Sequence, residues 1–96
     1  MSMDELRAKN RADILRLARK HGAANVRVFG SIARGSATES SDLDLLVDFA
    51  PDRSLLDQIA LQQELQALLG CPVDVVEPGG VSPYLADRIL AEAVPL

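Results

Sequence analysis

Two aspartates separated by a single residue form the part of this sequence best suited to chemistry. Asp42 and Asp44 open the run DLDLLVDF over residues 42–49, in which apolar side chains recur at alternate positions. Because strand side chains alternate between faces, both carboxylates are expected to project from one face, close together. Aspartate is a poor strand former, and two like charges held together are costly without a cation between them. The pair therefore predicts a site for a divalent cation, whereas Asp48, near the end of the run, is expected to be a solvated charge.

A Gly-Ser pair lies upstream, at the end of another short strand. Residues 26–29 are rich in β-branched and aromatic side chains and are followed by Gly30 and Ser31. A strand that ends in this way and turns into a helical segment presents free backbone N–H groups and a hydroxyl, which are donors that bind phosphate. By itself the dipeptide is an ordinary turn or helix cap. Beside a carboxylate pair on the following strand, it predicts half of a nucleotide site, with phosphates on the turn and Mg²⁺ on the aspartates.

Two further residues are candidates for the same site. Asp74 lies between β-branched residues in a strand expected over 73–76, where a bare carboxylate is expensive if buried. The alternative is an ordinary edge charge, but with the other two aspartates we take it as the third carboxylate of a two-metal site. Arg34 follows Ser31 by three residues and is within reach of a phosphate, and a solvated loop cation is an equally good interpretation.

Together these motifs resemble a known family. The stretches 28–35 and 41–47, followed by Asp74 on a later strand, are similar to the signature of the DNA polymerase beta-like nucleotidyltransferase superfamily. Within it they resemble the minimal nucleotidyltransferase (MNT) group of MntA-type antitoxins, over nearly the whole chain. Many members carry a basic residue where this sequence has Ile32, a departure that bears on the number of phosphate contacts and not on the metals.

The resemblance implies a role for each candidate residue. Gly30 and Ser31 would hold the triphosphate of ATP. Asp42 and Asp44 would bind two Mg²⁺ ions, and Asp74 would bind the catalytic metal and help to activate the incoming hydroxyl. Attack at the α-phosphorus releases pyrophosphate, and two metals neutralise both developing charges. The implied acceptor is a tyrosine of a partner HEPN-domain toxin, an RNase that the transferred AMP silences.

The composition limits the substrate. Ninety-six residues allow one minimal nucleotidyltransferase domain, 1–96, without room for a second substrate-binding domain. A net charge of −4, with one Tyr and two Phe, argues against direct binding of a polynucleotide. We therefore expect another protein to supply the acceptor hydroxyl. Because there is no signal peptide or membrane-length apolar run, a cytoplasmic protein without membrane contact is expected.

The pattern of apolar residues and helix caps predicts an α/β (α+β) fold, a sheet of short strands with helices packed on one side. The resemblance implies the polymerase beta-like nucleotidyltransferase fold, with a mixed sheet. Helices are expected over about 4–20, 55–69 and 83–92, and strands near 26–29, 43–49 and 73–76.

The helix expected over 55–69 is apolar around most of its circumference, which predicts two buried faces. One face would meet the sheet. The other would meet a partner protein, a second copy of this chain in a homodimer, or the other two helices of the same chain.

Two other functions remain open beside protein adenylylation. One is a non-catalytic antitoxin of nucleotidyltransferase fold that neutralises its partner by binding and occlusion. The other is adenylylation of a small molecule or an RNA end, which the acidic composition disfavours. The intact Asp42, Asp44 and Asp74 favour the catalytic protein over the occluding one.

Overall fold

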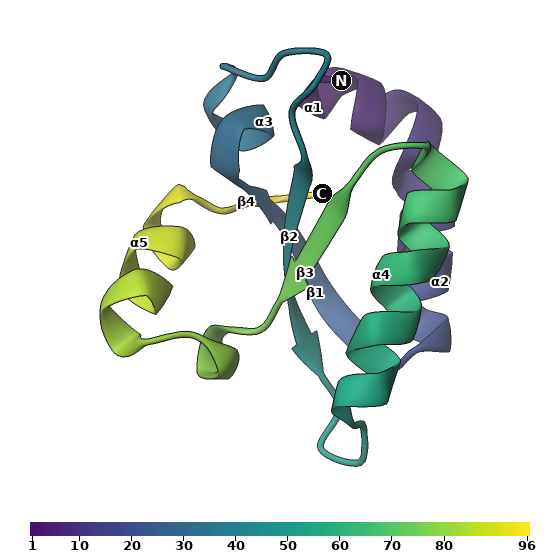
Figure 1. The fold of residues 1–96 in the computed structure, drawn as a ribbon, viewed down its shortest axis with the longest axis vertical. Helices are drawn as coiled ribbons and strands as arrows, with labels where there is room; N and C mark the ends of the chain where they lie inside the picture. Colours follow the sequence, from purple (N-terminus) through teal and green to yellow (C-terminus); the bar gives the residue numbers. More distant parts are fainter.

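A four-stranded mixed sheet forms the centre of the molecule (Figure 1). The computed structural model describes residues 1–96. The strand order is β3-β2-β1-β4, with β2 and β3 parallel and the other neighbours antiparallel. The strands are β1 (Ala23–Phe29), β2 (Leu43–Phe49), β3 (Val73–Val76) and β4 (Val94–Pro95). The expected α/β fold with a short mixed sheet is therefore confirmed.

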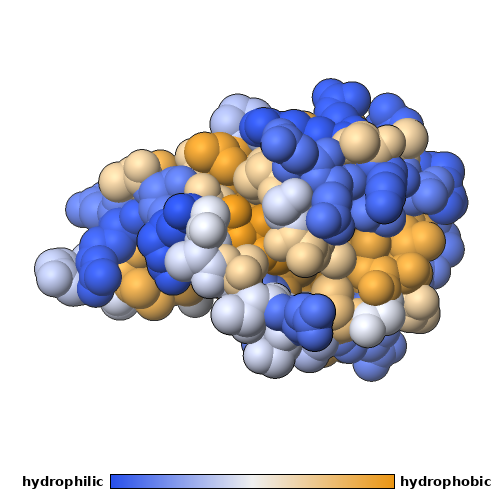
Figure 2. All heavy atoms as spheres, turned by 90° about the horizontal axis from the view of Figure 1, so that it is seen from above, coloured by the Kyte–Doolittle hydropathy of each residue, from blue (hydrophilic) through white to orange (hydrophobic).

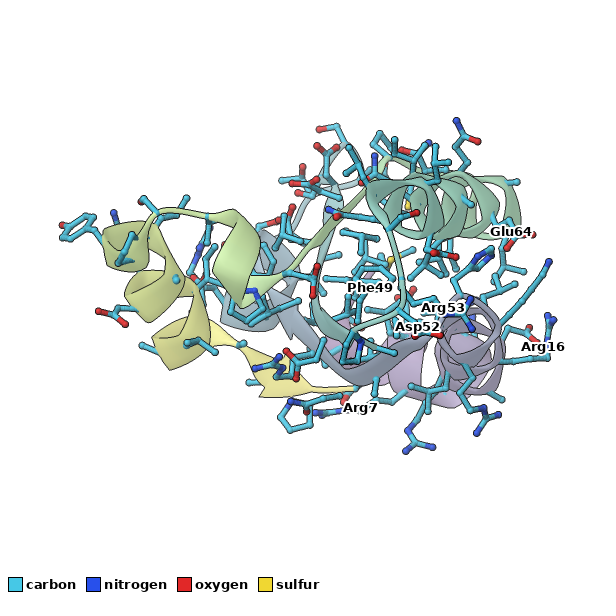
Figure 3. All side chains as sticks on the ribbon, turned by 90° about the horizontal axis from the view of Figure 1, so that it is seen from below. Arg7, Arg16, Phe49, Asp52, Arg53 and Glu64 are labelled. Carbon is cyan, nitrogen blue, oxygen red and sulfur yellow. The ribbon has the colours of Figure 1, made fainter.

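Helices cover both faces of this sheet, so the expectation that they pack on one side was wrong. The long helices α2 and α4 lie on one face, and α5 lies on the other (Figures 1 and 3). The reason is visible in β2, where the consecutive residues 45–47 are all buried, as happens when a strand is covered on both faces. The helical segments are α1 (Met3–Glu5), the π-helical η1 (Leu6–Asn10), α2 (Arg11–Lys20), α3 (Gly30–Arg34), α4 (Leu55–Leu69), the 3₁₀ turn η2 (Pro78–Gly80) and α5 (Pro83–Glu92).

Most element boundaries follow from local signals in the sequence. Ser54 caps α4, accepting a hydrogen bond from the Leu56 N–H at 3.2 Å, while the Asp57 carboxylate accepts the Ser54 N–H at 3.0 Å.

The observed elements differ from the expected ones at both ends of the chain and at the start of one strand. The first helix is interrupted by the π-helical turn η1, β1 begins at Ala23 rather than at residue 26, and β4 was not expected. A two-residue strand that contains a proline carries no periodic signal.

Strand β3 is an edge strand, and α4 supplies partners for its outer backbone groups. The Gln62 side chain accepts the Val75 N–H at 3.0 Å, and Gln58 donates to the Val75 carbonyl at 2.7 Å. One turn further along, Gln66 accepts the Val73 N–H at 3.2 Å. These bonds satisfy backbone groups that an edge strand otherwise leaves open. They also fix the position of β3, which carries Asp74.

The core lies between the sheet and the pair α2 and α4. Leu61 and Leu65 of α4 are fully buried in it, whereas Leu55 and Leu56 are 68% and 74% exposed. The second apolar face of α4 is therefore not covered by other helices of this chain. Figure 2 shows apolar side chains reaching the surface among hydrophilic ones over the half of the molecule that holds α2 and α4. None of the helices is both long and apolar enough to cross a membrane.

We predict that Leu65→Ala lowers the free energy of unfolding by about 2–5 kcal/mol, because it leaves a cavity in the core. The matched control is Leu56→Ala on the same helix, which removes the same atoms from an exposed position and should change stability by no more than about 0.5 kcal/mol. Urea unfolding followed by circular dichroism measures both. Equal losses in the two variants would show that α4 does not pack as described.

Candidate active site

The turn after β1 brings backbone against a carboxylate of the neighbouring strand. Gly30 is buried and has a φ of +77°, a left-handed conformation that side chains disfavour. A Cβ atom added to Gly30 would overlap the Asp44 carboxylate, so only glycine allows this approach. The register of the sheet produces the contact, because Phe29 at the end of β1 lies directly opposite Asp44 on β2.

Two carboxylates share this face of the sheet, and a third precedes it in the chain. Asp44 is in register with Asp74 on the parallel strand β3, and Asp42 lies two residues earlier, just before β2 begins. Burial raises the pKa of Asp44, and repulsion from Asp74 and Asp42 raises that pKa further. The three predicted aspartates therefore lie near enough to interact electrostatically, and Arg34 offsets only part of the repulsion at Asp44.

The donor set of this group suits a hard divalent cation. Carboxylate oxygens are the ligands that Mg²⁺ takes together with phosphate oxygens and water. No group of three acidic, imidazole or thiol side chains lies close enough together to hold a metal ion by itself, so phosphate and water oxygens would have to complete the coordination. The residues present therefore fit Mg²⁺ in the chemistry of their oxygen ligands, and a cation here would offset the repulsion at Asp44.

A residue from the far end of the chain completes the site, and sequence analysis missed it. Glu92, the last residue of α5, accepts the Gly30 N–H at 3.0 Å and forms an ion pair with Arg34. The Arg34 guanidinium and the Gly30 N–H lower the pKa of Glu92. An acidic residue at the C-terminal end of a helix opposes the helix dipole. That mismatch is the one sequence signal that could have pointed to a tertiary partner.

Arg34 and Ser31 differ in how they are engaged. Arg34 is held by Glu92 and is therefore not a free loop cation in this structure. The Ser31 side chain makes no hydrogen bond, which leaves its hydroxyl available. Asp48 lies outside the group and pairs with Arg27 at 3.3 Å, half exposed, as expected for a surface charge.

A cleft of about 460 Å³ adjoins the carboxylates on the side covered by α5. Half of its lining residues are hydrophobic and four are charged, a mixture that suits a flat ring joined to a polar group. Asp74 and Glu92 are the two acidic residues of the lining. The lining residues are Phe29, Gly30, Arg34, Asp74, Val76, Val81, Leu85, Arg88, Ile89 and Glu92.

The mixed sheet and a carboxylate face beside a glycine turn define the class as enzymes that transfer nucleotidyl groups. The chain belongs to the nucleotidyltransferase domain family, whose model matches residues 13–96. It is 38% identical over 94 residues to the protein adenylyltransferase MntA of Thermococcus cleftensis, covering 98% of this chain and 95% of that protein. It is 43% identical over 94 residues to a predicted protein adenylyltransferase of Methanocaldococcus jannaschii, covering 98% and 97%.

Solved structures agree with this assignment. A predicted minimal nucleotidyltransferase is 51% identical, with a TM-score of 0.86 over 100% of this chain and 97% of that one. A toxin–antitoxin complex with AMP-PNP contains a chain that is 25% identical, with a TM-score of 0.78 over 90% of this chain and 71% of that one. The expected nucleotidyltransferase fold and enzyme class are confirmed.

We predict that Gly30→Ala strongly slows nucleotidyl transfer while leaving the protein folded. Gly35 provides a matched control, because it has the same φ of +77° but open space where a Cβ would lie. Both alanine variants should lose about 1–2 kcal/mol of stability to the left-handed conformation. Only Gly30→Ala displaces the Asp44 carboxylate, and it should slow nucleotidyl transfer by about 100-fold. Urea unfolding and pyrophosphate release with the acceptor protein present measure the two effects, and equal transfer rates would contradict the role of this contact.

We predict that Asp44→Asn stabilises the protein at pH 7. The folded-state pKa of Asp44 lies above its ordinary value of 3.8, so the folded protein binds more protons than the unfolded chain between these two values. Stability from this group is therefore lost as the pH rises through the folded pKa. The increase in the free energy of unfolding caused by asparagine should be largest at neutral pH. It should disappear when the pH falls below the ordinary aspartate pKa of 3.8. Thermal unfolding of both proteins at pH 7 and in acid measures it, and a variant less stable at pH 7 would contradict the prediction.

Proposed function

We propose that this protein transfers AMP from ATP to a hydroxyl of a partner protein and thereby acts as the antitoxin of a toxin–antitoxin pair. The observation that carries the proposal is the placement of the Gly30 backbone against Asp44, with Asp74 in register on the next strand. This arrangement puts anion donors and metal-binding carboxylates side by side, as attack on a nucleotide requires. Residues 1–96 act as one minimal nucleotidyltransferase domain.

The proposed roles follow the positions of the residues. Gly30, Ser31 and Arg34 bind the phosphates, because the Gly30 N–H and the Arg34 guanidinium converge on a single anion and the adjacent Ser31 hydroxyl is unengaged. The three aspartates 42, 44 and 74 would hold two Mg²⁺ ions. When bound, Mg²⁺ supplies positive charge that offsets the charge developing on the attacking and leaving oxygens.

The reaction exchanges one P–O bond for another, and the acceptor hydroxyl gives up its proton to the Asp74 carboxylate. The acceptor oxygen attacks the α-phosphorus of ATP, and the bond from that phosphorus to the bridging oxygen breaks, releasing pyrophosphate. Asp74 faces the cleft and helps to activate the acceptor hydroxyl. The apolar walls of the cleft suit an aromatic group, which agrees with a tyrosine as the acceptor.

A protein acceptor is favoured by the acidic chain and by its relatives. A net charge of −4 disfavours binding of a nucleic-acid backbone. Relatives covering nearly the whole chain are named protein adenylyltransferases, and an MntA chain solved with its toxin is 27% identical with a TM-score of 0.75. The resemblance in the motifs implies a HEPN-domain toxin as the partner.

The competing function is neutralisation by binding alone. The apolar surface of α4 around Leu55 and Leu56 supports it, because that surface could contact a partner without any chemistry. The two functions differ in whether the carboxylates are needed for neutralisation.

Intact-mass spectrometry of the protein mixed with a HEPN-domain protein encoded beside it, ATP and Mg²⁺ separates these functions. We predict that the partner gains the mass of one or more AMP units with the wild type and none with the Asp42→Asn/Asp44→Asn variant. Asp48→Asn is the control, since it removes a carboxylate from the same strand outside the site and should leave transfer intact. A stable complex that silences the partner without any mass change would replace the proposal by occlusion.

A further inference from the structure

Glu92 binds two of the three groups that the proposed function assigns to the phosphates, the Gly30 N–H and the Arg34 guanidinium. One carboxylate oxygen accepts the Gly30 N–H at 3.0 Å, and the other pairs with the Arg34 guanidinium. A backbone N–H and a guanidinium bind carboxylate and phosphate oxygens by the same charge-assisted hydrogen bonds. The chain therefore carries its own anion in this position.

We propose that Glu92 is a specificity-determining residue of the nucleotide site, whose carboxylate must be displaced by a phosphate of the incoming nucleotide. The inference rests on the proposed function, because it takes Gly30 and Arg34 as phosphate ligands. A single N–H cannot serve two anions at full strength, so Glu92 and a phosphate compete for it.

The surrounding charges disfavour the Glu92 carboxylate in its position beside Gly30 and Arg34. Its negative charge adds to the repulsion at Asp44, and it ends a helix whose dipole disfavours an acid there. The Glu92 side chain is 26% exposed, so it has a route to solvent. The segment that follows is fixed, because β4 pairs with β1 and the Leu96 N–H donates to the Val26 carbonyl at 3.1 Å. Displacement therefore needs a change of the side chain and not of the whole helix.

This competition favours ligands with high negative charge. A triphosphate that also engages the cations on the aspartates can offset the lost contacts of Glu92, whereas a singly charged anion brings fewer contacts. Glu92 therefore selects for a metal-bound triphosphate over small anions at the same turn.

Calorimetric titration with AMP-PNP and Mg²⁺ tests the inference on four proteins. The wild type is compared with Glu92→Gln, which weakens the competitor, and with Glu92→Asp, which keeps the charge but shortens the reach to Gly30 and Arg34. Asp87→Asn is the control, because it removes a carboxylate of α5 that forms no hydrogen bond or ion pair. Both Glu92 variants should bind AMP-PNP about three- to tenfold more tightly, the range for losing one partly exposed ion pair and its hydrogen bond. Asp87→Asn should bind as the wild type does.

The possible outcomes are distinct. Unchanged or weaker binding by both Glu92 variants, with normal binding by the wild type, overturns the role of Glu92 and leaves the proposed function standing. Tighter binding by Glu92→Gln and not by Glu92→Asp would also overturn the role of Glu92. The tighter binding would then come from the lost charge and not from the lost contacts with Gly30 and Arg34. Absence of binding by all four proteins overturns both this inference and the nucleotide site. Thermal unfolding of each variant establishes that it is folded.

Discussion

The close approach of the Gly30 backbone to the Asp44 carboxylate is the contact on which the rest of the site depends. It needs a left-handed glycine, and it needs the β1–β2 register that sets Phe29 opposite Asp44. Burial of a carboxylate beside two others is costly, and the raised pKa of Asp44 records that cost. Such a cost is typical of functional sites, where local stability is given up for chemistry that needs the charge.

Helix α4 is apolar around most of its circumference because its polar residues are used to hold strand β3. Gln58, Gln62 and Gln66 recur every four residues and bond to the backbone of β3, so the polar face of this helix is directed at an edge strand. Apolar residues such as Leu55 are then left on the outer surface. The helix that looks apolar all round in the sequence is thus an anchor for the strand that carries Asp74.

Local signals explain why much of the architecture could be predicted from the sequence. The cap at Ser54 and the alternation along 43–49 act within a few residues, and the same alternation predicted that Asp42 and Asp44 share a face. The contact between Gly30 and Glu92 joins residues 62 positions apart and leaves no such pattern. The placement of α5 on the opposite face of the sheet likewise depends on tertiary packing that periodicity does not encode.

The cleft beside the carboxylates and the exposed apolar surface of α4 lie on opposite faces of the sheet. On the proposed function, an acceptor hydroxyl reaches Asp74 and the cleft, which lie on the side covered by α5, whereas the apolar surface of α4 belongs to the opposite side. A partner that touched only α4 could not then present a hydroxyl to the carboxylates. The proposed adenylylation would therefore need partner contact on the side of α5, where Glu92 also lines the cleft.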